Sequence, residues 1–468
     1  MPRCPSAPFP VRIERLELGG MGAGTGPDGQ PVLVRGAPPG AIVDVQPFAR
    51  RHGVVHARRV GCVEAPPGAV VPRCAVFGSC GGCVLQELDL PAQRAARHDL
   101  VLRTIGDLDG VRVHPPVGAD LAYGYRNRVE LTYGTDRWLD PAALAAGAPR
   151  GGRFLGFHPA GRFDRVVDVR RCELVPEGLN EVLAAARIHL ETSALPPWNP
   201  RAQSGFWRHL LLRISVDGAR LAAVYTAPPQ GSEADAEVEA LAAALPSGTG
   251  LAWFVSDRPS DAALGVLRAL VRPPGAIEER VGRLALRLQP TSFFQTSTAG
   301  AEILYATVAA LAGSGDRLLD LFCGVGPIGL WLAPSFREVV GVEAWPAAVA
   351  DAVQNARRNG IENIVFHGGP VEDRLASLAA DVAVVDPPRA GLHPRAVAAL
   401  AALGLSRLVY VACHPPSLAR DRRVLEAGGL AMTDLCTVDL FPQTGHVEGV
   451  ARFVARERPR QEGPRPTG

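Results

Sequence analysis

Cysteine residues form the first group in this 468-residue chain with a spacing that could do chemistry. Cys74, Cys80 and Cys83 stand close together in CAVFGSCGGC, with five and two residues between them. Thiolates at such short intervals are typical metal ligands, and three of them need a fourth ligand from elsewhere in the chain. A four-thiolate site can hold zinc or a [4Fe–4S] cluster, and thiolate chemistry alone leaves both open.

A second group of residues is typical of a nucleotide-binding site. In LLDLFCGVGPIGL, an apolar run ends near Asp320 and is followed by a turn with Gly324 and Gly326, where the backbone can pass close to a ligand. Glu343 ends the next apolar run, and a carboxylate there can accept hydrogen bonds from two ribose hydroxyls. Dinucleotide oxidoreductases and methyltransferases share these features. VVDPPRAGL favours a methyltransferase, because two prolines stiffen the loop after Asp386.

The composition excludes several enzyme classes. The chain has no lysine, so its 49 basic residues are all arginine, and mechanisms that need a lysine Schiff base or a phosphate-binding lysine are ruled out. We find no apolar run long enough to span a membrane, and no signal-peptide core in the first twenty residues. We therefore expect a cytoplasmic protein with reduced cysteines and no membrane partner.

The elements that must position these residues fall into three stretches. Residues 1–62 contain short β-rich runs between glycine-rich turns and carry eight arginines against four acids, which suits a small RNA-binding barrel or, alternatively, a solvated basic face. Residues 63–285 form a central domain of mixed strands and helices that contains the cysteine group. Residues 286–455 alternate strands and helices, as in a doubly wound parallel sheet, and 456–468 are expected to be a disordered tail.

With DPPR, YVACHPPSLARD and FPQTGHVE also in place, the chain resembles the uracil-C5 RNA methyltransferases, which use S-adenosylmethionine. The first sixty residues resemble a TRAM domain, CAVFGSCGGC resembles the family's iron–sulfur segment, and the motifs from QPTSFFQTS onward follow in order. The resemblance implies an α/β class I methyltransferase domain with a doubly wound, mostly parallel sheet. An N-terminal TRAM, OB-like β-barrel and a mixed α+β central domain precede it.

The resemblance also implies roles for individual residues. Cys413 would be the nucleophile and Glu448 the base, with Cys323 of the glycine-rich turn as the less favoured nucleophile. The implied ligands of S-adenosylmethionine are Gln295, Phe322, Gly324, Gly326, Glu343 and Asp386. The implied ligands of a [4Fe–4S] cluster are Cys74, Cys80, Cys83 and Cys172. We interpret Cys62 and Cys436 as small buried residues and Cys4 as a free thiol.

The implied reaction needs a thiolate and a carboxylate. Uracil C5 is a poor nucleophile, but addition of the Cys413 thiolate to C6 makes C5 able to accept the methyl group. Glu448 would then remove the C5 proton so that the thiolate is eliminated. The uridine must leave its stack to reach both groups, so we expect base flipping.

Three positions depart from the family pattern. His414 follows the nucleophile where asparagine is usual, Ser297 replaces an asparagine, and Pro327 stands where a polar residue is usual. A neighbouring imidazole can raise or lower the pKa of the Cys413 thiol, according to its own protonation state. The other two departures are expected to loosen contacts with the cofactor.

The expected substrate is RNA. A TRAM domain together with a cluster resembles the enzymes that modify large-subunit ribosomal RNA, and we expect such a protein to be a monomer. The alternatives are a tRNA uridine-C5 methyltransferase and a non-catalytic RNA-binding protein with a vestigial fold. Intact Cys413 and Glu448 argue against the last. Arg126 and Arg128, in YGYRNRVELTYG, are expected either to contact RNA or to stabilise their strand.

Overall fold

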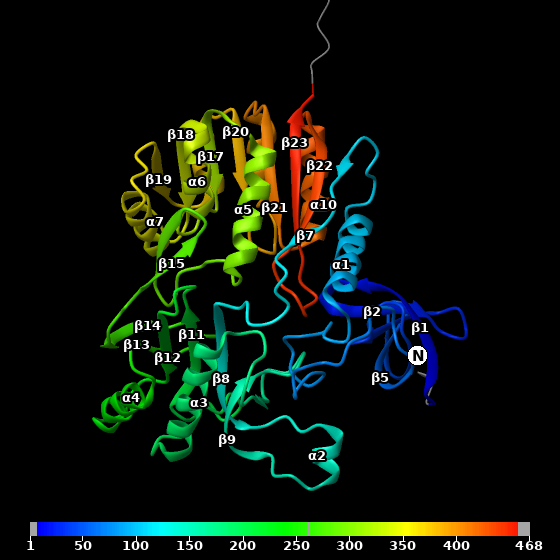
Figure 1. Cartoon of the computed structure of the whole chain (residues 1–468), viewed down its shortest axis with the longest axis vertical. Coiled ribbons are helices and arrows are strands. Elements are labelled where there is room, and N and C mark those ends of the chain that lie inside the picture. Colours follow the sequence, from blue (N-terminus) through cyan, green and yellow to red (C-terminus); the bar gives the residue numbers. More distant parts are fainter. Residues whose placement is uncertain (1–6, 260–261, 457–468) are drawn as a thin grey trace, which may run out of the picture. The chain divides into compact units, whose positions relative to one another are not determined.

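The computed structural model describes residues 7–259 and 262–456. The predicted tail, apart from residue 456, and Cys4 lie outside these residues. The chain forms two compact units (Figure 1). The first contains residues 1–100, 118–303 and 439–447, and the second contains 101–117, 304–438 and 448–468.

The first unit begins with a closed barrel of five strands in the order β1-β2-β3-β5-β4. Its elements are β1 (Phe9–Glu17), η1 (Leu18–Gly20), β2 (Met21–Thr25), β3 (Pro31–Arg35), β4 (Ile42–Arg51) and β5 (Val54–Glu64). Alternate side chains such as Val11, Ile13, Val43 and Val45 fill the barrel, as period-2 alternation requires. The predicted small N-terminal barrel is thus confirmed.

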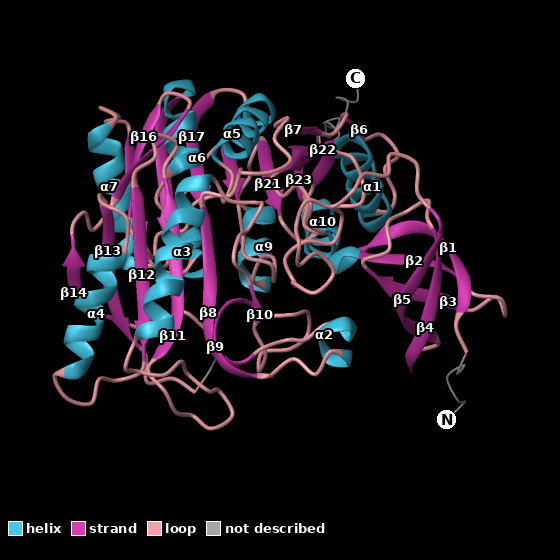
Figure 2. Cartoon of the chain, turned by 60° about the horizontal axis from the view of Figure 1, so that its bottom comes forward, coloured by secondary structure: helices cyan, strands magenta, loops and turns pink. Residues whose placement is uncertain are grey.

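A seven-stranded sheet makes up most of the rest of the first unit (Figure 2), in the order β10-β9-β8-β11-β12-β13-β14. Its strands are β8 (Arg128–Asp136), β9 (Gly151–Phe157), β10 (Val167–Asp168), β11 (Trp207–Ile214), β12 (Arg220–Thr226), β13 (Thr249–Val255) and β14 (Val266–Arg272). Helix α3 (Glu177–Thr192) packs on β9 and β11, and α4 (Glu233–Ala244) packs on α3 and β14. The remaining elements are α1 (Leu90–Ile105), α2 (Pro141–Ala145) and the hairpin of β15 (Ile277–Val281) and β16 (Leu284–Leu288).

The second unit contains a nine-stranded sheet with the order β19-β18-β17-β20-β21-β23-β22-β6, and β7 pairs with β22. The strands are β6 (Arg112–Val113), β7 (Val117–Gly118), β17 (Gly315–Leu321), β18 (Phe336–Glu343), β19 (Ile364–Gly368), β20 (Val382–Val385), β21 (Arg407–Ala412), β22 (Leu430–Asp439) and β23 (Glu448–Ala455). Strands β17 to β21 are parallel to one another, whereas β23 runs antiparallel to both β21 and β22.

Helices connect the parallel strands of this sheet. They are α6 (Pro327–Leu332), α7 (Pro346–Arg358), α8 (Val371–Arg374), α9 (Pro394–Ala402) and α10 (Pro415–Ala427), with short 3-10 turns η2 (Ala333–Ser335) and η3 (Leu375–Ser377). Helix α5 (Thr298–Ala312) precedes β17. Strand β20 is buried along its whole length, which explains its unbroken run of valine and alanine. This is the predicted doubly wound, mostly parallel sheet. None of the described helices is both long and apolar enough to cross a membrane.

Candidate active site

The glycine-rich turn after β17 adopts an unusual backbone conformation. Phe322, Gly324 and Gly326 have φ angles of 63°, 55° and 88°. Glycine adopts such values freely, whereas a phenylalanine there is strained, and strain of this kind often marks a ligand-binding turn. Gly326 precedes α6, and Pro327 occupies the first turn of that helix, where its fixed φ and missing N–H are compatible with helix structure. The departure at Pro327 therefore has a structural reason.

Glu343 joins the turns that follow β17 and β18. One carboxylate oxygen accepts a hydrogen bond from the Gly324 N–H at 3.0 Å, and the other accepts one from the Trp345 N–H at 2.8 Å. A carboxylate oxygen has two lone pairs, so each can still accept a second hydrogen bond from a ligand hydroxyl. Glu343 thus fixes the loop conformation and retains the acceptors expected of a ribose-binding residue.

Asp320 is a buried carboxylate to which the sequence pattern assigns no ligand role. Its Oδ2 accepts a hydrogen bond from the Gly329 N–H at 2.7 Å, while its buried Oδ1 has no partner among the described residues. Burial, with smaller contributions from Asp386 and Glu343, raises the pKa of Asp320 to about 7. An unpartnered buried acceptor beside the glycine-rich turn fits a site that is completed by a ligand.

Strand order brings Cys413, Glu448 and Asp386 to one edge of the sheet. Asp386 follows β20 and Cys413 follows β21, so both lie at carboxyl ends of neighbouring parallel strands. Strand β23 begins at Glu448 and runs antiparallel to β21, with Ala412 opposite Gly449. Its first residue therefore lies beside the end of β21, although 35 residues separate Cys413 from Glu448 in the sequence.

These three groups interact electrostatically. Burial raises the pKa of Cys413 to about 12, with Glu448 and Asp386 adding to the increase and Arg389 opposing it. Burial raises the pKa of Glu448 well above its usual range, and Asp386 adds to this increase while Arg389 opposes it. Burial raises the pKa of Asp386 to about 7. The buried Glu448 Oε2 has no hydrogen-bond partner among the described residues. These shifts favour the uncharged thiol and the protonated Glu448, and added positive charge would favour their ionised forms.

The other cysteines of the chain lie in different surroundings. Cys323 is buried behind the glycine-rich turn, and burial raises its pKa well above the ordinary value, which suits a packing residue. Cys436 is buried in β22 as expected. The interpretation of Cys62 as a buried residue is wrong: it is exposed near the end of β5, where the strand leaves the barrel core and burial ceases.

Four cysteines gather in the first unit. Cys74, Cys80, Cys83 and Cys172 all line one small pocket, together with apolar residues such as Phe77 and Phe157. Burial raises the pKa of Cys80 to about 11 and that of Cys83 to about 12, and the neighbouring thiols contribute. Among the described residues, however, no group of three His, Cys, Asp or Glu side chains lies close enough together to bind a single metal ion. The positive charge of Arg126 opposes the increase in the pKa of Cys80 and of Cys172, so it acts on these thiols electrostatically.

Gln295 belongs to the first unit, and its expected part in cofactor binding stays a prediction. The segment that carries it is fixed by Asn127, which the sequence pattern does not single out. The Asn127 side-chain amide donates to the Gln295 carbonyl and to the Thr298 hydroxyl, both at 3.0 Å. Ser297 accepts a hydrogen bond from the Gly300 N–H at the start of α5, so serine keeps the helix-capping ability of the usual asparagine.

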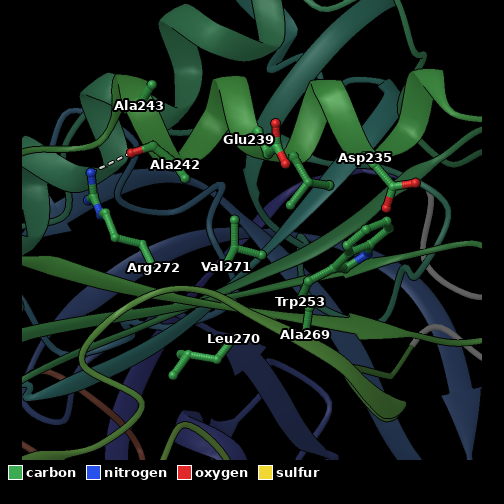
Figure 3. A pocket seen from close by; sticks show the side chains of 10 residues that line it. Asp235, Glu239, Ala242, Ala243, Trp253, Ala269, Leu270, Val271 and Arg272 are labelled. Atoms are coloured by element: carbon green, nitrogen blue, oxygen red, sulfur yellow. Dashed lines mark hydrogen bonds between the residues drawn. The ribbon is translucent and has the colours of Figure 1, made fainter.

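An open groove between α4 and β14 lies apart from these residues (Figure 3). Asp235 and Glu239 on α4 and Trp253 and Arg272 on the sheet line it. It contains none of the predicted site residues.

The sheet order and the turns at its carboxyl edge define a class I methyltransferase. A family model described as a methyltransferase domain matches residues 312–454. A solved tRNA (uracil-54, C5)-methyltransferase from Pyrococcus abyssi, in complex with S-adenosyl-L-homocysteine, is 25% identical with a TM-score of 0.74. The alignment covers 95% of this chain and 100% of that one.

Curated relatives extend over nearly the whole chain. A protein of Chlorobaculum tepidum named as an RNA methyltransferase is 36% identical, with 92% of each chain covered. One of Caldanaerobacter subterraneus with the same kind of name is 34% identical, with 94% of this chain and 96% of the relative covered. The chain therefore belongs to the RNA methyltransferase family, and the resemblance seen in its motifs is confirmed.

Proposed function

We propose that this protein transfers the methyl group of S-adenosylmethionine to C5 of a uridine in RNA, with large-subunit ribosomal RNA as the substrate. The observation that carries the proposal is the convergence of Cys413, Glu448 and Asp386 at one sheet edge. A nucleophilic thiol next to a buried carboxyl group is the combination that methylation at C5 requires.

The residues of the second unit suit the methyl donor. Glu343 offers carboxylate oxygens to the ribose hydroxyls, and the turn from Phe322 to Gly326 lets the backbone approach the nucleoside. The neighbour bound to S-adenosyl-L-homocysteine supports this assignment. When bound, S-adenosylmethionine supplies an electrophilic methyl group and a positive charge.

Cys413 and Glu448 divide the remaining work. The Cys413 sulfur forms a bond to C6, and the electron pair of the C5–C6 double bond forms the bond from C5 to the methyl carbon. The bond between that carbon and the donor sulfur would break with its electrons remaining on sulfur, so that the donor leaves as S-adenosylhomocysteine. Glu448, in its ionised form, takes the proton from C5, the C5–C6 double bond re-forms, and the C–S bond breaks to release the thiolate. Burial favours the uncharged form of both groups, whereas the nearby Arg389 and the positive charge of the bound donor would favour their ionised forms.

The four pocket cysteines suit a [4Fe–4S] cluster in the kind and number of their donors. Cys74, Cys80, Cys83 and Cys172 would bind it, and it would hold the segment around residues 74–83 against Cys172. The cluster takes no part in the steps described above.

Methyl transfer with labelled donor tests the proposal. Purified protein, prepared without oxygen, is incubated with ribosomal RNA or tRNA and labelled S-adenosylmethionine, and the nucleosides are separated. We expect 5-methyluridine from ribosomal RNA. The same product from tRNA alone would favour the second candidate, a tRNA uridine-C5 methyltransferase, which the similarity to the tRNA enzyme supports. Label in another nucleoside, or none with either RNA, would contradict the uracil-C5 assignment.

A further inference from the structure

Helix α10 holds the loop that follows β20. The Ser417 hydroxyl donates to the Arg389 carbonyl at 2.8 Å, and the Asp421 carboxylate accepts from the Leu392 N–H at 2.9 Å. Between these contacts, Gly391 has a φ of 78°, and a Cβ there would lie 2.8 Å from the Ser417 Cβ. A side chain at position 391 would therefore collide with α10, so glycine lets the loop pack closely, and two hydrogen bonds hold it against the helix.

His414 extends this contact to the residue after the nucleophile. Its Nδ1 lies 2.9 Å from the Ser417 oxygen. A hydroxyl has one hydrogen, and Ser417 donates it to Arg389, so the hydroxyl can only accept from His414. The hydrogen-bond network thus assigns a proton to Nδ1, and this donor is present in the neutral and in the charged imidazole alike.

Arg389 connects these hydrogen bonds to the reactivity of Cys413, because its positive charge acts on the thiol. The charged groups that act on the Cys413 thiol are Glu448 at the start of β23, Asp386 at the end of β20, and Arg389 in the loop. The two carboxyl groups disfavour the thiolate, and Arg389 favours it. A loop held at the Arg389 carbonyl keeps the cation in position to act on Cys413.

We propose that His414 and Ser417 are positioning residues that hold the Arg389 backbone, and with it the guanidinium, in place beside Cys413. The inference deepens the proposed function, since it rests on Cys413 as the nucleophile. It also accounts for the departure from the family pattern: asparagine, the usual residue, and histidine both offer an N–H donor to the Ser417 hydroxyl.

The reactivity of Cys413 can be measured without RNA or methyl donor. Trypsin cleaves after Arg407 and Arg420, and the peptide LVYVACHPPSLAR between these sites contains no cysteine except Cys413. The intact protein is treated with iodoacetamide at pH 8 for increasing times, and mass spectrometry of this peptide gives the alkylation rate. The thiolate is the reacting form, so the rate reports how readily Cys413 ionises.

Removing the hydroxyl should slow alkylation. We expect Ser417→Ala to lower the rate about threefold or more, His414→Ala to lower it less, and Ser417→Thr and His414→Asn to keep it near that of the parent protein. The matched control is Ser406→Ala, which removes a similar 2.7 Å hydrogen bond from a hydroxyl to the Asp381 carbonyl at the other end of β21. Thermal unfolding of each variant shows that the fold is retained.

A double variant tests whether Ser417 acts through Arg389. Arg389→Gln should itself slow alkylation, and adding Ser417→Ala should cause little further change, because both substitutions remove the same influence. The inference is overturned if Ser417→Ala reacts as fast as Ser406→Ala, or if the effects of Arg389→Gln and Ser417→Ala multiply. If the variants behave as expected but the parent protein methylates no uridine, the positioning role stands and the proposed function fails.

Discussion

Two regions of this protein contain partly buried thiols, and the groups around those thiols differ. At the edge of the second unit's sheet, the single thiol of Cys413 interacts with Glu448, Asp386 and Arg389. In the pocket of the first unit, Cys80 accepts a hydrogen bond from the Gly82 N–H, and the charged groups that act on it are other cysteines and Arg126. Burial is the largest cause of the raised pKa in both regions, so the pKa alone does not distinguish a nucleophile from a metal ligand. The neighbouring groups do, because carboxyl groups can move protons and a set of thiols can bind a metal.

The largest expected difference between the regions is in catalysis. Cys413→Ala should lower methyl transfer to RNA by about 10⁴-fold or more, because the variant lacks the thiolate that adds to C6 and activates C5. Cys436→Ala, which changes another buried cysteine of the same sheet, should keep the rate within about threefold. The measurement is incorporation of labelled methyl groups. Turnover by Cys413→Ala would remove the distinction between a catalytic and a packing thiol in this sheet.

Iron should be bound by the cysteine pocket of the first unit and not by Cys413. Protein purified without oxygen should contain about four irons per chain, and Cys83→Ser and Cys172→Ser should each lose most of them. Cys62→Ser, a change at an exposed cysteine of the barrel, and Cys413→Ala should both retain the iron. Elemental analysis that finds stoichiometric zinc and no iron would overturn the cluster and leave a four-thiolate zinc site.

Donor binding should depend on Glu343, at the carboxyl edge of the second unit's sheet. Glu343→Ala should weaken binding of S-adenosylmethionine about tenfold to a hundredfold, because the variant loses the ribose acceptors and the hydrogen bonds that fix the turn at Gly324. Glu338→Ala, on the same strand, removes an ion pair with Arg317 and should leave the affinity unchanged. Calorimetry measures both. Equal affinities in the two variants, or tight binding of a nicotinamide dinucleotide by the parent, would contradict the donor site.

The pH dependence of Cys413 alkylation tests the surroundings of this thiol without any substitution. The pKa of this thiol is raised to about 12, so the thiolate is a small fraction throughout the range from pH 7 to 10. That fraction, and with it the alkylation rate, should rise about tenfold per pH unit over the whole range. An unperturbed cysteine has a pKa of about 8.5, and its rate levels off above that value. A plateau near pH 9 for the 408–420 peptide would show that burial and the carboxyl groups do not control Cys413.

Local patterns in the sequence predict much of this structure. The run into Asp320, the glycines after it and the prolines after Asp386 each mark the carboxyl end of a strand, so they indicate both the sheet and its binding edge. Cys413 and Glu448 come from motifs that the family resemblance identifies. The antiparallel insertion of β23 between β21 and β22, which places Glu448 beside Cys413, follows from that resemblance and not from periodicity.

Contacts between distant segments could not be predicted in the same way. Asn127 lies 168 residues from Gln295 in the sequence. Nothing in its neighbours Arg126 and Arg128 indicates that its side-chain amide fixes the segment around Gln295. The sequence allows Arg126 either to contact RNA or to stabilise its strand. Only the structure indicates that its charge acts on the cysteine pocket. Cys62 was misjudged because the burial of a strand residue depends on where the strand leaves the barrel. Side-chain partners of this kind depend on tertiary packing, which a single sequence does not show.

Trapping of a covalent adduct tests the central claim most directly. Glu448→Gln, the parent protein and Cys413→Ala are each incubated with ribosomal RNA and donor labelled in the methyl group, and then separated on denaturing gels. Because Glu448 acts only after methyl transfer, Glu448→Gln should add to C6, methylate C5 and stall, leaving labelled RNA joined to protein. Cys413→Ala should give no such band. Normal turnover without an adduct in Glu448→Gln would contradict the roles assigned to this thiol and carboxylate.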